Sequence, residues 1–208
     1  MKVTATRSPL AKAVSASAEE SVTLLLARAR LVGLPKNASR ALVFGCGSGH
    51  TTAALGDQLG FALGIDPSEE LVSSAELVHP PRGNCEFAVG DVADLAALSG
   101  RFDLILADLS HRQLVGRREI PLVASALLSA LTPGGIAAIG ISARGSLRRR
   151  ATTPWSTMAD GIAAAGGRVT WTSRPEDGTV WVFARGRLPH LRLLPAAQQF
   201  GAIPSNEG

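Results

Sequence analysis

Ala41-Leu42-Val43-Phe44-Gly45-Cys46-Gly47-Ser48-Gly49-His50-Thr51-Thr52 is the stretch that decides the fold of this chain. An apolar run ends in three glycines at alternate positions, and a segment compatible with a helix follows. This order predicts a buried strand, a tight turn and the start of a helix. Glycine lets a ligand approach the backbone with no Cβ in the way, and a helix start offers free N–H donors at the positive end of its dipole. The turn therefore predicts a site for a nucleotide-like cofactor.

Short apolar runs and helical patterns alternate on both sides of this turn. Strands are predicted at 41–44, 62–65, 86–89, 104–107 and 136–141. Helices are predicted at 18–32, 51–59, 69–78, 92–98, 120–131 and 154–165. Such alternation is typical of an α/β protein with a mostly parallel, doubly wound sheet that is covered on both faces.

The last two β-rich runs follow a different pattern. Residues 168–174 and 179–185 flank the segment Pro175-Glu176-Asp177-Gly178. Because Pro, Asp and Gly favour turns, the pattern predicts a C-terminal antiparallel β-hairpin. A doubly wound sheet that closes with such a hairpin is unusual among nucleotide-binding sheets.

Length and composition indicate one globular domain. The chain has 208 residues, of which 46% are apolar and 18% charged, which fits a single core and excludes a disordered protein. We predict a flexible arm over 1–17, one domain over 18–187 and an extended tail over 188–208. No apolar run reaches the roughly 20 residues that span a bilayer, and the N-terminus lacks the apolar core of a signal peptide. Two cysteines, Cys46 and Cys85, make no disulfide framework, so a cytoplasmic location is predicted.

The spacing of the glycines distinguishes between two kinds of cofactor. Dinucleotide sites use G-x-G-x-x-G, in which the third glycine allows close packing of helix and strand. Here the glycines are Gly45, Gly47 and Gly49, and the sixth position is His50, which would obstruct that packing. The spacing favours the G-x-G-x-G turn of S-adenosylmethionine (SAM) sites, which wraps the amino-acid and ribose parts of the ligand.

Acidic residues follow three successive predicted strands. Asp66 ends the second strand, where a carboxylate can accept both hydrogen bonds from a ribose diol; this contact fits NAD equally well. Asp91 ends the third strand, where it can accept from the exocyclic amine of adenine, and Asp108 ends the fourth. Since doubly wound sheets bind ligands at the carboxyl ends of their strands, these acids belong to one site.

Together with the Leu131-Thr132-Pro133-Gly134-Gly135 turn and the final hairpin, these motifs resemble the class I SAM-dependent methyltransferase family over roughly residues 41–185. The resemblance implies a seven-stranded sheet ordered 3-2-1-4-5-7-6, with strand 7 antiparallel. It also implies SAM as the cofactor. The residues expected to bind it are Gly45, Cys46, Gly47, Gly49, His50, Asp66, Pro67, Asp91, Val92 and Asp108.

One position departs from the family pattern. Members often carry an acid two residues before the first glycine, where it helps to organise the ammonium end of the ligand. Val43 stands there in this chain. A non-catalytic SAM-fold protein, acting as a binding or partner subunit, therefore stays open as an alternative.

The residues after the fourth strand are expected to face the transferred methyl group. They read Asp108-Leu109-Ser110-His111-Arg112. Methyl transfer is an in-line displacement, in which the enzyme positions the nucleophile and, where needed, removes a proton. His111 is the candidate general base, because imidazole titrates near neutral pH, and Asp108 is a candidate for orienting the acceptor. Asp108 also resembles the first metal ligand of catechol-type O-methyltransferases, but no carboxylate follows the fifth strand, so no metal is expected.

The favoured function is metal-independent methyl transfer to an O or N atom of a small molecule. The chain has 21 basic and 17 acidic residues and a net charge of +4. An RNA methyltransferase with an arginine-rich surface is the alternative. Its phosphate contacts would include Arg112, Arg117, Arg118, Arg144, Arg148, Arg149 and Arg150. No membrane partner is predicted, and a homodimer stays open.

Overall fold

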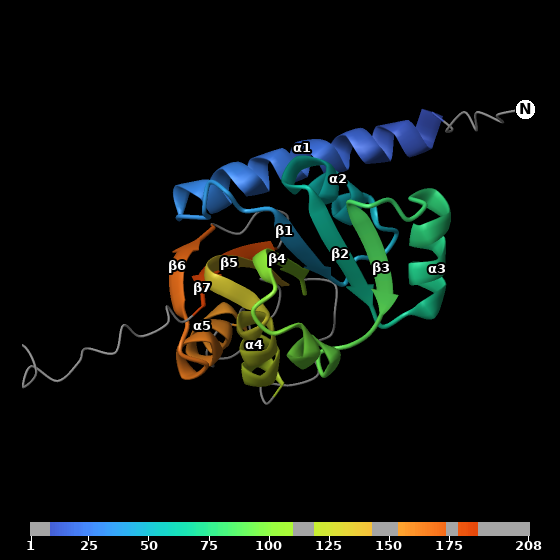
Figure 1. The fold of residues 1–208 in the computed structure, drawn as a ribbon. Coiled ribbons are helices and arrows are strands. Elements are labelled where there is room, and N and C mark those ends of the chain that lie inside the picture. The colour runs from blue at the N-terminus through green and yellow to red at the C-terminus, as the bar shows by residue number, and fades with distance from the viewer. Residues whose placement is uncertain (1–8, 110–118, 143–153, 174–178, 187–208) are drawn as a thin grey trace, which may run out of the picture.

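A seven-stranded sheet in the order β3-β2-β1-β4-β5-β7-β6 runs through the middle of the molecule (Figure 1). The computed structural model describes residues 9–109, 119–142, 154–173 and 179–186, and the statements below concern these residues. The strands are β1 (Arg40–Phe44), β2 (Phe61–Asp66), β3 (Cys85–Val89), β4 (Phe102–Asp108), β5 (Leu131–Ser142), β6 (Arg168–Thr172) and β7 (Thr179–Arg185).

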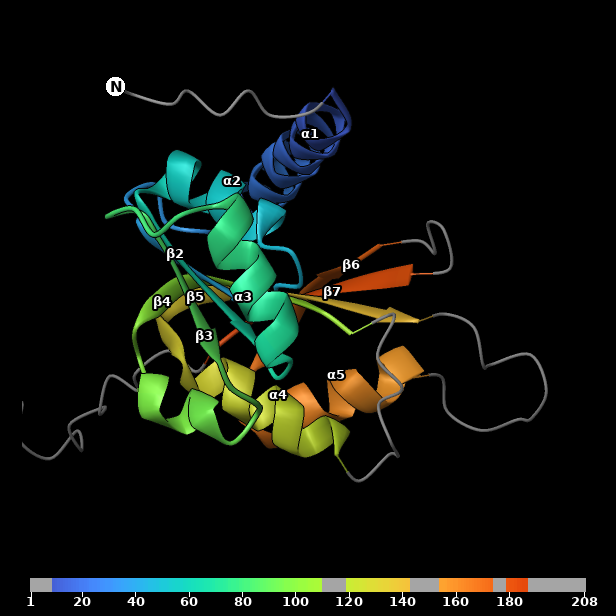
Figure 2. The same cartoon turned by 90° about the vertical axis from the view of Figure 1, so that its right-hand side faces the viewer.

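Helices cover both faces of this sheet. Figure 2 shows α1, α2 and α3 on one side and α4 and α5 on the other. The helices are α1 (Pro9–Leu31), α2 (His50–Leu59), α3 (Glu69–Val78), α4 (Ile120–Ser129) and α5 (Pro154–Ala164), with a short 3₁₀ helix, η1 (Asp94–Leu98), after β3. Neighbouring strands from β3 to β5 pair in parallel, whereas β7 runs antiparallel to both β5 and β6. The predicted fold class and strand order are confirmed.

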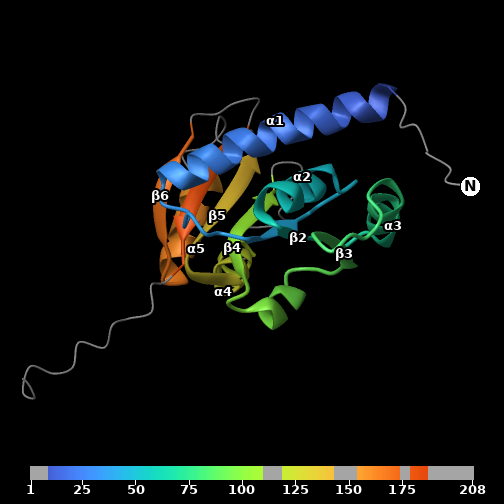
Figure 3. The same cartoon turned by 45° about the horizontal axis from the view of Figure 1, so that its top comes forward.

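Alternate residues of the strands build two separate cores, because successive side chains of a strand point to opposite faces. On β1, Leu42 and Phe44 pack in the core beneath α4 and α5. Ala41 and Val43 pack in the core that faces α1 and α2. The second core matters most for function, because α1 lies across the sheet there, from the β6 end to α2 (Figure 3).

Two predicted helix boundaries were wrong. Helix α1 begins at Pro9 rather than at residue 18, so part of the predicted arm is helical. Pro9 can begin α1, because proline is compatible with the first turn of a helix, where its missing N–H is not needed. Helix α4 ends at Ser129, two residues before the predicted end, since Leu131 already pairs with Phe102 as the start of β5. The remainder of the predicted arm and the predicted tail lie outside the described residues.

Two half-buried side chains fasten α1 and β1 to the sheet. Asp103 on β4 accepts hydrogen bonds from the N–H groups of Ser39 and Arg40 at 2.9 and 3.1 Å. Arg185 on β7 donates through Nη2 to the carbonyl oxygens of Val32 and Gly33, at 3.2 and 2.7 Å, just after α1 ends. Cations stabilise the carbonyl end of a helix. These contacts fix the start of β1 and the C-terminal end of α1 to the sheet.

Helix α2 packs so closely on the loop before β3 that Gly56 has no room for a side chain. A Cβ at Gly56 would overlap the carbonyl oxygen of Asn84, which also accepts the Ala62 N–H at 2.9 Å. We expect Gly56→Ala to lower the free energy of unfolding by about 1–3 kcal/mol, although alanine favours a helix by about 1 kcal/mol. Thermal denaturation measures the change. Gly83→Ala is the matched control, because its Cβ would meet nothing within 4 Å; a Gly56→Ala protein as stable as the control would contradict the packing.

Candidate functional site

The glycine turn between β1 and α2 folds through three left-handed glycines. The φ angles of Gly45, Gly47 and Gly49 are 79°, 54° and 80°, a region that disfavours residues with a Cβ. The N–H groups of Gly45 and Cys46 both donate to the carbonyl oxygen of Ile65, at 2.7 and 3.1 Å. The turn is thus held against the end of β2 by its own backbone.

Asp66 completes the attachment of the turn. One carboxylate oxygen of Asp66 accepts the Gly47 N–H at 3.1 Å, and the other accepts the Ser68 N–H at 3.0 Å. The side chain is only 4% exposed. Ser68 in turn caps α3 by accepting the Leu71 N–H at 3.3 Å. Sequence reasoning assigned Asp66 to a ligand; the structure adds that it organises the turn that would hold that ligand.

Gly47 and Gly49 differ in what surrounds them. A Cβ at Gly47 would meet nothing within 4 Å, whereas a Cβ at Gly49 would press on Phe87 and Ala75. Gly49 is therefore needed for packing at the start of α2. Gly47 faces open space, and the turn offers its backbone to a ligand on that side.

Asp91 and Val92 follow β3, the strand that pairs with β2. Asp91 is exposed, and its Oδ1 accepts the Ala93 N–H at 2.7 Å. Its own N–H donates to Asp94 Oδ2 at 2.8 Å. Val92 is half-buried against the core, and Pro67 at the end of β2 is exposed. The side chains of Asp91 and Asp94 thus hold the turn at 90–94 in shape by hydrogen bonds. The predicted adenine contact lies in this turn.

His50 points toward α3. Its Nδ1 lies 2.9 Å from Nε2 of His79, with the ring centroids 4.7 Å apart. His79 is buried, and sequence reasoning had assigned it no role. The pairing could not be read from the sequence, because the two histidines are far apart in the chain and show no common motif.

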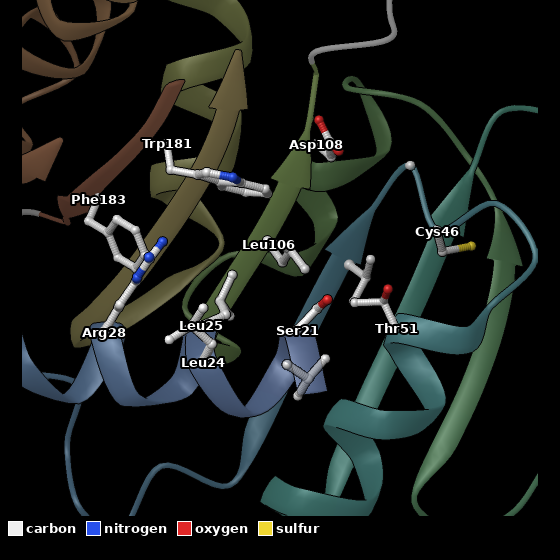
Figure 4. A pocket seen from close by; sticks show the side chains of 13 residues that line it. Ser21, Leu24, Leu25, Arg28, Cys46, Thr51, Leu106, Asp108, Trp181 and Phe183 are labelled. Carbon is white, nitrogen blue, oxygen red and sulfur yellow. The ribbon is translucent and has the colours of Figure 1, made fainter. Parts of the chain in front are cut away.

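A cavity of about 440 Å³ opens from the glycine turn and runs beneath α1 (Figure 4). Three predicted site residues, Gly45, Cys46 and Asp108, line it. The other lining residues are Ser21, Val22, Leu24, Leu25 and Arg28 of α1, Val43, Thr51 and Leu106, and Trp181 and Phe183 of β7. A volume of this size is typical of small-molecule sites. The cavity connects the end of β4 to the turn that the sequence singled out.

The strand register explains why side chains of β4 and β7 line the same cavity. Asp108, Gly140 and Trp181 are paired across β4, β5 and β7, and Leu106, Ala138 and Phe183 form the next such row on the same face. A Cβ at Gly140 would lie 3.0 Å from the Trp181 ring and 3.1 Å from Asp108 Oδ1. The side chains of Trp181 and Asp108 therefore meet over Gly140, which is buried beneath them.

Trp181 and Phe183 were missed as functional residues. The sequence signal was present: two aromatic residues two positions apart on one strand must share a face. We took the run only as one arm of a hairpin. The pairing of β7 with β5 decides which face of β7 lies over the cavity. That pairing joins residues that are distant in the sequence.

Val43, at the position where an acid is usual in the family, contributes an apolar wall to this cavity. Its side chain is 4% exposed. Arg28 and Asp108 are the charged side chains among the lining residues. His111, the predicted base, lies outside the described residues, and so does the arginine cluster at 144–150.

Cys85 is a poor nucleophile in this setting. Burial and then the nearby Asp57 carboxylate raise the pKa of the Cys85 thiol from 9.0 to about 11, so the thiol stays protonated at neutral pH. Cys46 is buried at the cavity wall. Within the part of the chain that the structure describes, no group of three or more His, Cys, Asp or Glu side chains is arranged to hold a metal ion, and no described helix is long and apolar enough to cross a membrane.

Comparison with known proteins adds a family and a set of similar structures. Residues 41–135 match the family model of a methyltransferase domain. No curated protein matches the chain. A SAM-dependent methyltransferase from Clostridium acetobutylicum is 14% identical with a TM-score of 0.64, covering 80% of this chain and 90% of its own.

Two further structures have similar folds. Magnesium protoporphyrin IX methyltransferase from Synechocystis, with S-adenosylhomocysteine (SAH) bound, is 19% identical with a TM-score of 0.60, covering 83% of both chains. A structure described by the conversion of a disulfide bond into a thioacetal group during echinomycin biosynthesis is 25% identical with a TM-score of 0.56, covering 71% of this chain and 75% of its own.

The Cys85 environment predicts a pH dependence. The thiol ionises near pH 9.0 when exposed and near 11 in the fold, so between these values the unfolded chain binds fewer protons and the free energy of unfolding falls as pH rises. We expect Cys85→Ala to remove part of that decline in urea titrations at pH 8 and 10. Alkylation of Cys85 by iodoacetamide, followed by peptide mapping, should be slow at pH 8 in the folded protein and fast in urea. Equal rates in both conditions would contradict the burial.

Proposed function

We propose that the chain, whose residues 41–135 match the family model of a methyltransferase domain, is a class I SAM-dependent methyltransferase that transfers a methyl group from SAM to an O or N atom of a small molecule. The single observation that carries the proposal is the cavity beneath α1. It begins at the glycine turn and reaches Asp108 at the end of β4, so a cofactor on the turn and an acceptor in the cavity would be neighbours.

The residues present fit SAM. Gly47 leaves open space beside its backbone, which suits a ligand that approaches the turn closely. The buried Asp66 carboxylate at the end of β2 supports a ribose contact, and Asp91 with Val92 supports an adenine contact. Gly45 and Cys46 would flank the methionine part. Val43 supplies an apolar wall there, so the ammonium group must find its partners among backbone carbonyl oxygens or other side chains.

When bound, SAM supplies an electrophilic methyl group on a positively charged sulfur. The protein's part is positioning, which can account for much of the rate of such a displacement. Asp108 can accept a hydrogen bond from the O–H or N–H of an acceptor at the mouth of the cavity. Leu25, Leu106 and Phe183 exclude water from the cavity. His111 remains the predicted base for an acceptor that must lose its proton.

The alternatives are less well supported. The RNA hypothesis depends on arginines outside the described residues, whereas the cavity beneath α1 has the volume typical of a small-molecule site. The partner-protein hypothesis depends on Val43 and predicts that neither SAM nor SAH binds. The SAH-binding experiment below decides the partner-protein hypothesis. RNA binding measured at low salt decides the RNA hypothesis, because phosphate contacts weaken steeply as salt is added.

Asp66→Ala tests the cofactor assignment. We expect calorimetry with SAH to show binding to the unaltered protein and a loss of about 1.5–3 kcal/mol in the variant, as for a charge-assisted hydrogen bond. Asp160→Ala is the matched control, because Asp160 is an exposed acid on α5, on the far side of the sheet. Because Asp66 also bonds the Gly47 N–H, Asp66→Asn, which keeps a side-chain oxygen, should lose less. Unchanged affinity in Asp66→Ala would refute the assignment.

Metal removal tests the mechanism. We expect the rate of SAH formation with any accepted substrate to be the same in EDTA as in Mg²⁺, because positioning by Asp108 requires no divalent ion. A rate lost in EDTA and restored by added Mg²⁺ would show that a metal ion takes part. Mass spectrometry of ligands retained through purification provides the first candidate substrates.

A further inference from the structure

We propose that the outer face of α1 binds the same face of α1 in a second copy of this chain, with the two helices antiparallel. The proposal is drawn from the exposed apolar residues of this face, from two opposite charges beside them and from the place of α1 on the outside of the molecule. It does not depend on SAM binding.

The outer face of α1 carries a regular row of exposed residues. Five of them follow one another at alternating spacings of three and four: Ser17, Glu20, Leu24, Ala27 and Leu31. Helices that pair with another helix repeat their contact residues at these spacings, and we call this row the outer stripe. The opposite face of α1 packs into the core that faces α2, through Val22, Leu26 and Ala29. The outer stripe thus faces away from the protein's own core.

Two leucines of the outer stripe expose a large apolar area. Leu31 is 86% exposed, more than any other large apolar side chain that the structure describes, and Leu24 is 53% exposed. Ala27 lies between them, and its small side chain lets another helix come close. Figures 1 and 3 show α1 along the outside of the molecule, where a second helix can lie against it. Burial of this apolar area would drive association.

Two charged side chains decide the direction of the pairing. Glu20 and Arg30 are both exposed, at opposite ends of the apolar residues, and neither forms an ion pair with another described residue. Parallel helices would set like charges side by side, which is unfavourable. Antiparallel helices set Glu20 of each copy beside Arg30 of the other, and they also place opposite ends of the helix dipoles together.

One antiparallel register satisfies the apolar and the charged residues together. With the two-fold axis between Leu24 and Ala27, each Leu24 packs on Ala27 of the second copy, a large side chain on a small one. Leu31 then packs on the methylene groups of Glu20 of the second copy, whose carboxylate reaches Arg30. Each contact is made twice, as a two-fold symmetric interface requires.

The pairing would be weak and would reach the cavity. A single helix pair buries less than the roughly 800 Å² per partner of a standard interface, so we expect a Kd on the order of 10 µM. Leu24 also lines the cavity beneath α1. The second copy would therefore pack against the outside of that cavity's wall.

Sedimentation equilibrium of the full chain, between about 1 and 300 µM, tests the pairing over a range that spans this Kd. We expect a monomer–dimer equilibrium. The double variant Leu24→Ser/Leu31→Ser should weaken it at least about tenfold, since its two leucines are the apolar centre of the contact. Leu122→Ser is the matched control, because Leu122 is 66% exposed and lies on α4, on the other side of the sheet; it should dimerise like the unaltered protein.

Charge exchange tests the antiparallel direction. Glu20→Arg alone and Arg30→Glu alone should each weaken the dimer at least about threefold, because each sets like charges together. The double variant Glu20→Arg/Arg30→Glu restores opposite charges in both pairs and should recover the original Kd. Circular dichroism checks that every variant keeps its helices.

A chain that stays monomeric over the whole range overturns this inference, since the outer stripe is then left to solvent or to another segment of the same chain. A dimer that is unchanged in Leu24→Ser/Leu31→Ser overturns it as well, because the interface then lies elsewhere. Failure of the double charge variant to recover contradicts the antiparallel register.

Discussion

The hydrogen bond between the Asp66 carboxylate and the Gly47 N–H is the contact on which the site depends. It joins the end of β2 to the middle of the glycine turn, at 3.1 Å, and the second carboxylate oxygen reaches the loop before α3. A buried carboxylate is costly unless its oxygens are hydrogen-bonded. The hydrogen bonds that offset this cost at Asp66 also shape the glycine turn. One residue thus orders the ends of two strands, and Gly47 stays open to a ligand.

The second constraint is the register of β4, β5 and β7. The predicted hairpin brings β7 back antiparallel to β5, which sets Trp181 opposite Gly140 and Phe183 opposite Ala138. The same residues of β5 pair with Asp108 and Leu106 on the other side. Four side chains of these rows line the cavity that α1 covers: Asp108, Leu106, Trp181 and Phe183. The antiparallel end of the sheet thus supplies one wall of that cavity.

Much of the fold and half of the site could be predicted from the sequence. The glycine turn and the acids at 66, 91 and 108 follow from local patterns, since each motif lies at the end of its own strand, whereas the strand order follows from the resemblance to the methyltransferase family. The cavity could not be predicted in this way. Its roof comes from α1 and its wall from Trp181 and Phe183, which meet Asp108 only through pairing of distant strands. The His50–His79 contact was not predicted for the same reason. The start of α1 at Pro9 was not predicted because proline can either interrupt a helix or begin one.

A crystal structure of the protein with SAH tests the central claim, that one continuous site runs from the glycine turn into the cavity beneath α1. We predict the ribose at Asp66, the backbone of Gly47 against the ligand and the thioether sulfur at the mouth of the cavity, between Cys46 and Asp108. An SAH molecule whose sulfur points away from this cavity, or whose ribose makes no contact with Asp66, would contradict the account.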